Sequence, residues 1–115
     1  MKIKNIKPPR KFLVGKNKTE ISHVANIFLN DNELITFFTN KKNEYDIVKK
    51  DWGYYATPSI NSRLKNNNFK TALVINEKKQ VFIMLIEKSK KQLFTKYLKK
   101  EKNKVVSWLD DEYKI

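Results

Sequence analysis

The residues with the most binding chemistry gather in one stretch, Asp51 to Leu64, which reads DWGYYATPSINSRL. It combines aromatic rings, hydroxyl and amide groups and a guanidinium. The candidate ligand contacts are Trp52, Tyr54, Tyr55, Thr57, Ser59, Asn61, Ser62 and Arg63. The rings could stack on a sugar or a base, and Arg63 with the hydroxyl groups could hold a phosphate or carboxylate. The stretch therefore predicts a site for an anionic small molecule, such as a sugar nucleotide or a phosphate.

The same stretch has the pattern of a strand that ends at a helix start. Aromatic side chains favour a strand up to Tyr55, Thr57 is a candidate N-cap, and Pro58 suits the first helical position. The free N–H groups and partial positive charge of a helix start would attract an anion. An alternative interpretation is structural, with a capped helix whose neighbouring aromatic residues fill the core.

Other residue types limit the chemistry that the chain can perform. It has no cysteine, which excludes disulfides, thiolate nucleophiles and cysteine-ligated metals. His23 is the only histidine, so we interpret it as a structural or surface residue and expect neither a metal nor a cofactor. The sequence contains no P-loop, G-x-S-x-G, H-E-x-x-H or glycine-rich dinucleotide motif. A small enzyme without a recognisable motif is therefore an alternative function, not the leading one.

The charge balance is strongly basic, at +13, with 25 Lys and Arg against 12 Asp and Glu. Only Arg10 and Arg63 are arginines, and the abundance of Lys, Asn and Ile is typical of an AT-rich genome. We expect non-specific binding of nucleic acid at low salt. A specific RNA or single-stranded DNA binding protein is an alternative function, because aromatic rings and lysines together form stacking grooves.

The length of 115 residues suits one domain. We expect an N-terminal arm over residues 1–11, where Pro8 and Pro9 favour extended backbone, and a single domain over residues 12–115. No run approaches the roughly 20 apolar residues of a membrane span, and no signal-peptide pattern is present, so we expect a cytoplasmic protein. A homodimer or another protein partner is also a candidate, since small sheets with open edges often associate.

The predicted elements give an α+β fold, with an antiparallel sheet and two helices. The expected strands cover residues 33–39, 45–48, 71–75, 81–86 and 105–109, with a bulged strand or two short strands over 21–29 and a turn over 40–43. A short helix follows Pro58, and a longer one covers residues 89–102 with Ser89 as its cap. The acidic residues 110–112 form either a solvated terminus or a partner for surface lysines.

The arrangement of these elements leaves two topologies open. The runs 71–75 and 81–86 are continuously apolar, so we expect both at the centre of the sheet, covered on both faces. From Tyr45 onward the order is β-α-β-β-α-β, which is the order of a ferredoxin-like unit. The alternative is an antiparallel sheet with both helices on one face and no ferredoxin-type pairing.

The run W-G-Y-Y-A-T-P-S-I-N-S-R-L, with the later F-K-T-A-L-V and V-V-S-W-L-D, resembles a group of small uncharacterised bacterial proteins. That group is associated with gene clusters for surface-polysaccharide biosynthesis. The resemblance covers residues from about 27 to 111 and defines no functional residues. It implies a cytoplasmic accessory role beside glycosyl or sugar-nucleotide enzymes. The sequence as a whole thus predicts a non-catalytic binding or accessory protein.

Overall fold

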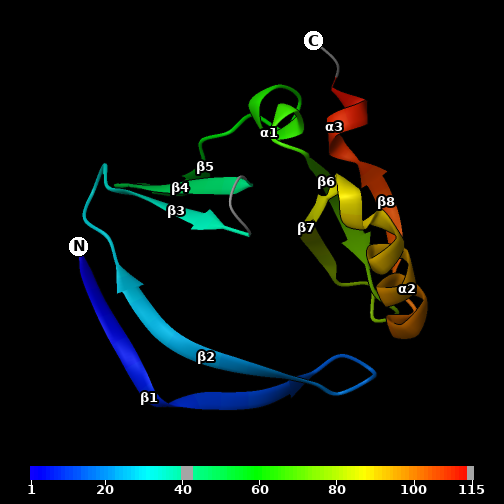
Figure 1. Cartoon of the computed structure of the whole chain (residues 1–115), viewed down its shortest axis with the longest axis horizontal. Helices are drawn as coiled ribbons and strands as arrows, with labels where there is room; N and C mark the ends of the chain where they lie inside the picture. The colour runs from blue at the N-terminus through cyan, green and yellow to red at the C-terminus, as the bar shows by residue number, and fades with distance from the viewer. Residues whose placement is uncertain (40–42, 114–115) are drawn as a thin grey trace.

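The fold combines antiparallel sheets with short helices, as a computed structural model of residues 1–39 and 43–113 shows (Figure 1). Over these described residues the strands are β1 (Lys2–Val14), β2 (Thr19–Phe28), β3 (Leu34–Phe38), β4 (Glu44–Lys50), β5 (Gly53–Ala56), β6 (Phe69–Ile75), β7 (Val81–Glu87) and β8 (Lys104–Trp108). The helices are α1 (Arg63–Asn66), the 3-10 helix η1 (Lys88–Lys90), α2 (Lys91–Glu101) and α3 (Leu109–Glu112). The predicted α+β class is confirmed. The predicted turn over residues 40–43 lies largely outside the described residues.

The first sheet is a long two-stranded hairpin of β1 and β2, which we call the strap (residues 2–28). Figure 1 shows it running beneath the other two sheets, from the end next to β3 to the end next to α2. Residues 2–11 of the predicted arm belong to β1, and residues 21–28 of the segment predicted as irregular belong to the single strand β2. The irregularity falls on β1 instead, between Asn5 and Arg10.

The second sheet has the order β3-β4-β5, and the side chains of its central strand alternate between the two faces. Asp46 and Val48 lie on one face and are buried, whereas Tyr45 and Ile47 lie on the other. Val48 stands opposite Leu34 on β3 and Tyr55 on β5. The sheet is therefore built around one buried valine and one buried carboxylate.

The third sheet has the order β7-β6-β8 and carries the core. Ala72 and Val74 on β6 are fully buried, with Ile86 of β7 beside them, and Phe94 and Leu98 of α2 pack against this cluster. β6 is central, as predicted. The same prediction is wrong for β7, which is an edge strand, because a three-stranded sheet has one central position and β6 takes it.

Two further predictions are corrected by the strand order and the helix starts. β4 pairs with β3 and β5 in a different sheet from β6, so the described strands do not form the ferredoxin-type pairing. Ser89 lies inside η1 and makes no side-chain cap bond, and α2 starts two residues later at Lys91. Among the described helices, none is long and apolar enough to cross a membrane.

The acidic residues near the C-terminus are engaged within the protein. Asp110 is only 1% exposed, and Lys70 Nζ lies 3.2 Å from its Oδ2 and 3.4 Å from Oδ2 of Asp111. The Thr71 backbone N–H donates to Asp110 Oδ1 at 3.1 Å. Of the two interpretations of this cluster, the intramolecular partner for a lysine is therefore confirmed.

Candidate functional site

Two exposed aromatic rings stand together where β4 turns into β5. Trp52 lies in the turn and Tyr55 lies on β5, and their rings are nearly parallel, with centroids 5.9 Å apart and an interplanar angle of 15°. Trp52 is 67% exposed and Tyr55 is 47% exposed. We call this pair the aromatic platform. It offers a flat apolar surface to solvent in place of a contribution to the core.

Tyr54 belongs to the opposite face of the same sheet. Successive side chains of a strand point to opposite faces, and Tyr54 stands opposite Lys49 whereas Tyr55 stands opposite Val48. The three predicted aromatic contacts are therefore divided, with Tyr55 and its stacking partner Trp52 on one side and Tyr54 on the other. Tyr54 is 59% exposed, so its ring is as accessible as those of the platform.

Lys50 supplies a positive charge on the face that carries the platform. It follows Val48 by two residues, so its side chain lies on the same face as Val48 and Tyr55. Its Nζ donates to Asn32 Oδ1 at 2.5 Å, which is a neutral partner. Sequence reasoning missed this residue, although the two-residue period of β4 and the short turn at Trp52 could have indicated it.

Arg63, the predicted anion contact, is paired inside the protein. Its Nη2 lies 2.9 Å from Asp46 Oδ2 and donates to Thr57 Oγ1 at the same distance of 2.9 Å. The pKa of Asp46 is lowered first by a hydrogen bond from the Thr36 hydroxyl and then by Arg63 and Thr57, against the desolvation that burial imposes. The Arg63 guanidinium therefore already pairs with the carboxylate of Asp46, a residue that is only 8% exposed.

The helix start predicted at Thr57 and Pro58 is wrong. α1 starts at Arg63, its N-cap Ser62 makes no side-chain cap bond, and Pro58 is buried in the connection after β5. The physical reason is that the Thr57 hydroxyl is engaged with Arg63 and Asp46 and does not cap a helix. Ser59 accepts the Arg63 backbone N–H at 3.2 Å instead.

The remaining predicted contacts, Ser59, Asn61 and Ser62, lie in the turn that precedes α1. The backbone oxygen of Ser59 accepts the N–H groups of Ser62 at 3.4 Å and of Leu64 at 2.9 Å. These residues shape a turn, and the described contacts place them around Arg63, not around the platform. The predicted stretch therefore separates into an exposed aromatic pair and a polar group whose arginine pairs with a carboxylate of the same chain.

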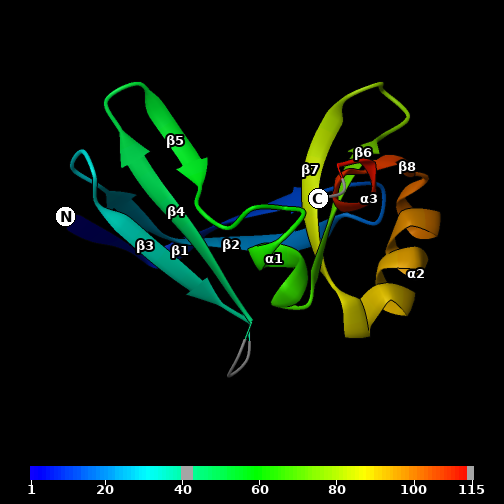
Figure 2. The same ribbon diagram turned by 90° about the horizontal axis from the view of Figure 1, so that it is seen from above.

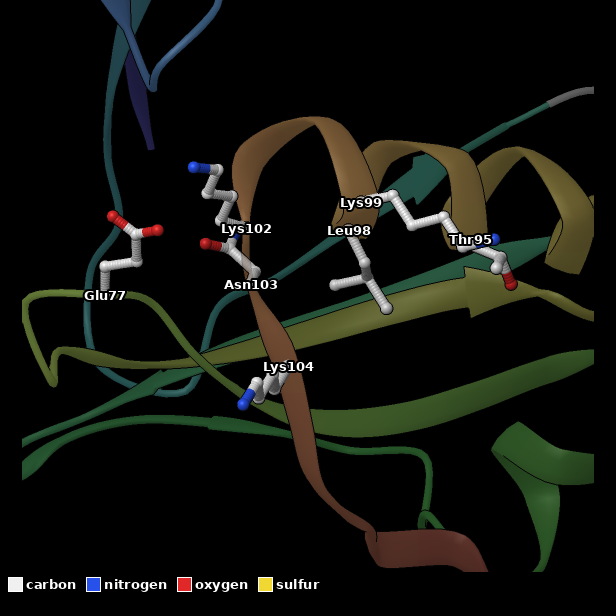
Figure 3. Close-up of a pocket in the computed structure, with 7 residues that line it drawn as sticks. All are labelled: Glu77, Thr95, Leu98, Lys99, Lys102, Asn103 and Lys104. Atoms are coloured by element: carbon white, nitrogen blue, oxygen red, sulfur yellow. The ribbon is translucent and has the colours of Figure 1, made fainter.

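A cavity of about 570 Å³ lies beside the last turn of α2 (Figure 3). It is lined by Glu77, Thr95, Leu98, Lys99, Lys102, Asn103 and Lys104. Figure 3 shows the amino groups of its three lysines pointing in different directions around a central leucine. A phosphate needs donors that converge on it, so this arrangement does not resemble an anion site.

His23 lies in the strap with internal partners. Arg10 Nε approaches its Nδ1 at 3.4 Å, and its Nε2 lies 3.1 Å from the carbonyl oxygen of Ala25. Across residues 1–39 and 43–113, no group of three or more His, Cys, Asp or Glu side chains is placed to hold a metal ion.

Comparisons of the chain with protein-family models, with curated proteins and with solved structures found no match. A function must therefore be inferred from the chain's own residues.

Proposed function

We propose that this chain is a non-catalytic binding protein that holds the ring of a sugar nucleotide or sugar phosphate on the aromatic platform. The observation that carries the proposal is the exposed, parallel pair of Trp52 and Tyr55. Tryptophan is normally highly buried, and a stacked pair that is left in solvent has a surface suited to a flat ring. Both the base and the sugar of a nucleotide sugar have a ring face that could stack on this surface.

The charged part of the ligand would be attracted by Lys50. Arg63 is neutralised by Asp46, whereas Lys50 lies on the face of the platform and bonds a neutral amide. The overall charge of +13 also favours an anionic ligand over a neutral one. We therefore transfer the predicted phosphate contact from the arginine to this lysine.

The resemblance to proteins of surface-polysaccharide gene clusters supports the same class of ligand. Enzymes that build such polymers consume sugar nucleotides, and a binding protein beside them would act as an accessory to those enzymes. The proposed setting is therefore the cytoplasmic side of polysaccharide synthesis.

The proposal predicts that one ring on the platform matters and that an equally exposed ring elsewhere does not. Uridine diphosphate glucose, glucose 1-phosphate and short RNA and DNA oligonucleotides would be titrated at about physiological salt, with calorimetry as the readout. Trp52→Ala should weaken nucleotide-sugar binding by about 5- to 150-fold, because stacking on one ring contributes about 1–3 kcal/mol. The matched variant Tyr54→Ala should bind like the wild type.

The same titration tests the lysine. Lys50→Met should weaken binding more than Lys49→Met, because Lys49 lies on the opposite face and pairs with Asp31.

Other outcomes of this titration decide between the functions. Equal losses for Trp52→Ala and Tyr54→Ala would contradict a site on the platform. Binding of oligonucleotides alone that depends on Trp52 would favour the RNA or single-stranded DNA alternative. Oligonucleotide binding that disappears at physiological salt and ignores both rings would show charge attraction only.

A further inference from the structure

Strand β7 has an apolar edge that the chain leaves open. Within the described residues it pairs with β6 on one side, and no strand pairs with its other side. The run Val81 to Ile86 is continuously apolar and contains neither a charged residue nor a proline. Soluble proteins usually protect an edge strand with such residues, or cover it. β7 therefore has the properties of a strand that pairs with another chain.

Exposure locates the open part at the first half of the strand. Val81 is 52% exposed, Phe82 is 44% exposed and Ile83 is 69% exposed, whereas Ile86 is buried. The far end is occupied, because Thr39 and Asn43 from the neighbouring sheet donate to Glu87 at 2.6 and 2.7 Å. Figure 2 shows the second and third sheets converging toward that end of β7 and diverging toward its start. A docking strand would thus approach Val81–Ile83.

The chain exposes more surface than a compact monomer of its mass. It exposes 8737 Å², whereas a compact monomer of this mass exposes about 6600 Å². Its radius of gyration is 15.8 Å, against about 13 Å for a compact domain of this length. The excess area is larger than the roughly 800 Å² that each partner buries in a standard interface.

We propose that the occupant of this edge is a second copy of the chain, with the two β7 strands antiparallel about a twofold axis. Each chain carries a net charge of +13, but the exposed run of β7 is uncharged. The paired strands would therefore not place like charges opposite each other. An edge that pairs with itself makes an isologous interface, which closes at two copies. The result is one continuous six-stranded sheet with β7 and its symmetry mate at the centre.

The geometry fixes which residues face each other. Directly opposed residues of antiparallel strands share a face, so a perpendicular twofold pairs residues of equal parity. An axis at Phe82 or at Ile83 brings Val81, Phe82 and Ile83, each at least 44% exposed, into the pairing. In either case one β7 residue stands opposite itself in the partner, which makes that position a specific marker of the interface.

Cysteine substitution tests this pairing cleanly because the chain has no cysteine of its own. Phe82→Cys and Ile83→Cys would be oxidised separately, with Leu93→Cys as the control, since Leu93 is 62% exposed on α2. A disulfide needs Cα atoms within about 7 Å, so one of the two β7 variants should form a covalent dimer while the control stays monomeric. Cross-linking of both β7 variants no faster than the control would overturn the proposal.

Sedimentation of the unmodified chain provides the second test. The wild type should sediment with twice the 13.7 kDa mass of one chain. Ile83→Lys should sediment as a monomer and keep a folded circular dichroism spectrum. Leu93→Lys should remain a dimer. Added salt should strengthen the dimer, because it screens the repulsion between two chains of +13. A wild type that stays monomeric at every concentration, or that forms an open ladder of larger species, would refute the closed dimer. If the chain is monomeric alone and captures an acidic protein in a salt-sensitive manner, the occupant is that partner and not a second copy.

Discussion

Arg63 is the cationic partner of the nearly buried Asp46 carboxylate, and this pairing gives a stability prediction. Asp46 is 8% exposed and accepts hydrogen bonds from Arg63, Thr57 and Thr36. Arg63→Ala should lower the free energy of unfolding by about 1–2 kcal/mol, because a nearly buried carboxylate loses its cationic partner. Urea denaturation would measure the effect, with Lys65→Ala, two positions further along α1, as the control. An unchanged midpoint for Arg63→Ala would mean that water replaces the guanidinium without cost.

Glu87 makes the attachment of the second sheet to β7 sensitive to acid. The Thr39 hydroxyl first, then the Asn43 amide and the Lys90 ammonium, lower the pKa of Glu87 from 4.5 to about 2. Because the folded state takes up this proton only at lower pH, the stabilisation is complete above about pH 4.5 and is lost as the pH falls toward 2. Unfolding of the wild type and Glu87→Gln, followed from pH 6 to pH 2, should show a smaller acid-induced loss in the variant. Parallel curves for the two proteins would contradict the assigned hydrogen bonds.

At the scale of elements, the strap is held to the rest of the molecule at its tip. The carboxylate of Glu101, which is 7% exposed, accepts the backbone N–H groups of Lys16 at 2.8 Å and Asn17 at 3.3 Å. Gly15 precedes them with φ of 74°, and a Cβ at this position would overlap the Glu101 carboxylate. The glycine is therefore required both by the left-handed backbone and by the close approach of the glutamate.

Gly15→Ala should release the tip of the strap without disturbing the core. Amide exchange at Lys16 and Asn17 should accelerate by about tenfold, equivalent to about 1.4 kcal/mol of lost protection, while exchange in β6 stays unchanged. Gly53→Ala is the control, since Gly53 also has a positive φ but has nothing within 4 Å of an added Cβ. Faster exchange at Lys16 and Asn17 in both variants would point to a general loss of stability.

The sequence predicted where strands and helices lie better than it predicted what surrounds each of them. The strand β4 and the helix α2 were recognisable because their apolar residues follow the spacing typical of a strand and of a helix. The continuous apolar runs of β6 and β7 are alike in composition, yet one is central and the other is an edge. That difference depends on how many strands join the sheet, which no local pattern contains.

The candidate site was predictable in composition and not in arrangement. The sequence indicated the aromatic residues, but the split between Tyr54 and Tyr55 follows from pairing with β4. The partner of Arg63 is also distant in sequence, since Asp46 precedes it by 17 residues. The predicted ligand contacts therefore separated once long-range pairing was known, and Lys50 entered the site for the same reason.

At the scale of the whole molecule, the division into three sheets was not predictable from local patterns. Each strand of the described chain pairs within its own sheet, and the strap contacts the body at its tip through Glu101 and near its start through the Met1 ammonium and Glu33. The choice between one sheet and several depends on contacts between residues far apart in the sequence, which periodicity does not encode.

The strap also has the properties of a spacer of fixed length. The tip of the strap contacts Glu101, and β2 leads from this tip toward β3. Its ten residues span about 33 Å at the rise of a strand. The longest dimension of the molecule is 40 Å. A strap longer or shorter by two residues in each strand would move its tip by nearly 7 Å while preserving which side chains share a face. A change of one residue would instead reverse the faces of the strap, so variation in its length should occur in steps of two.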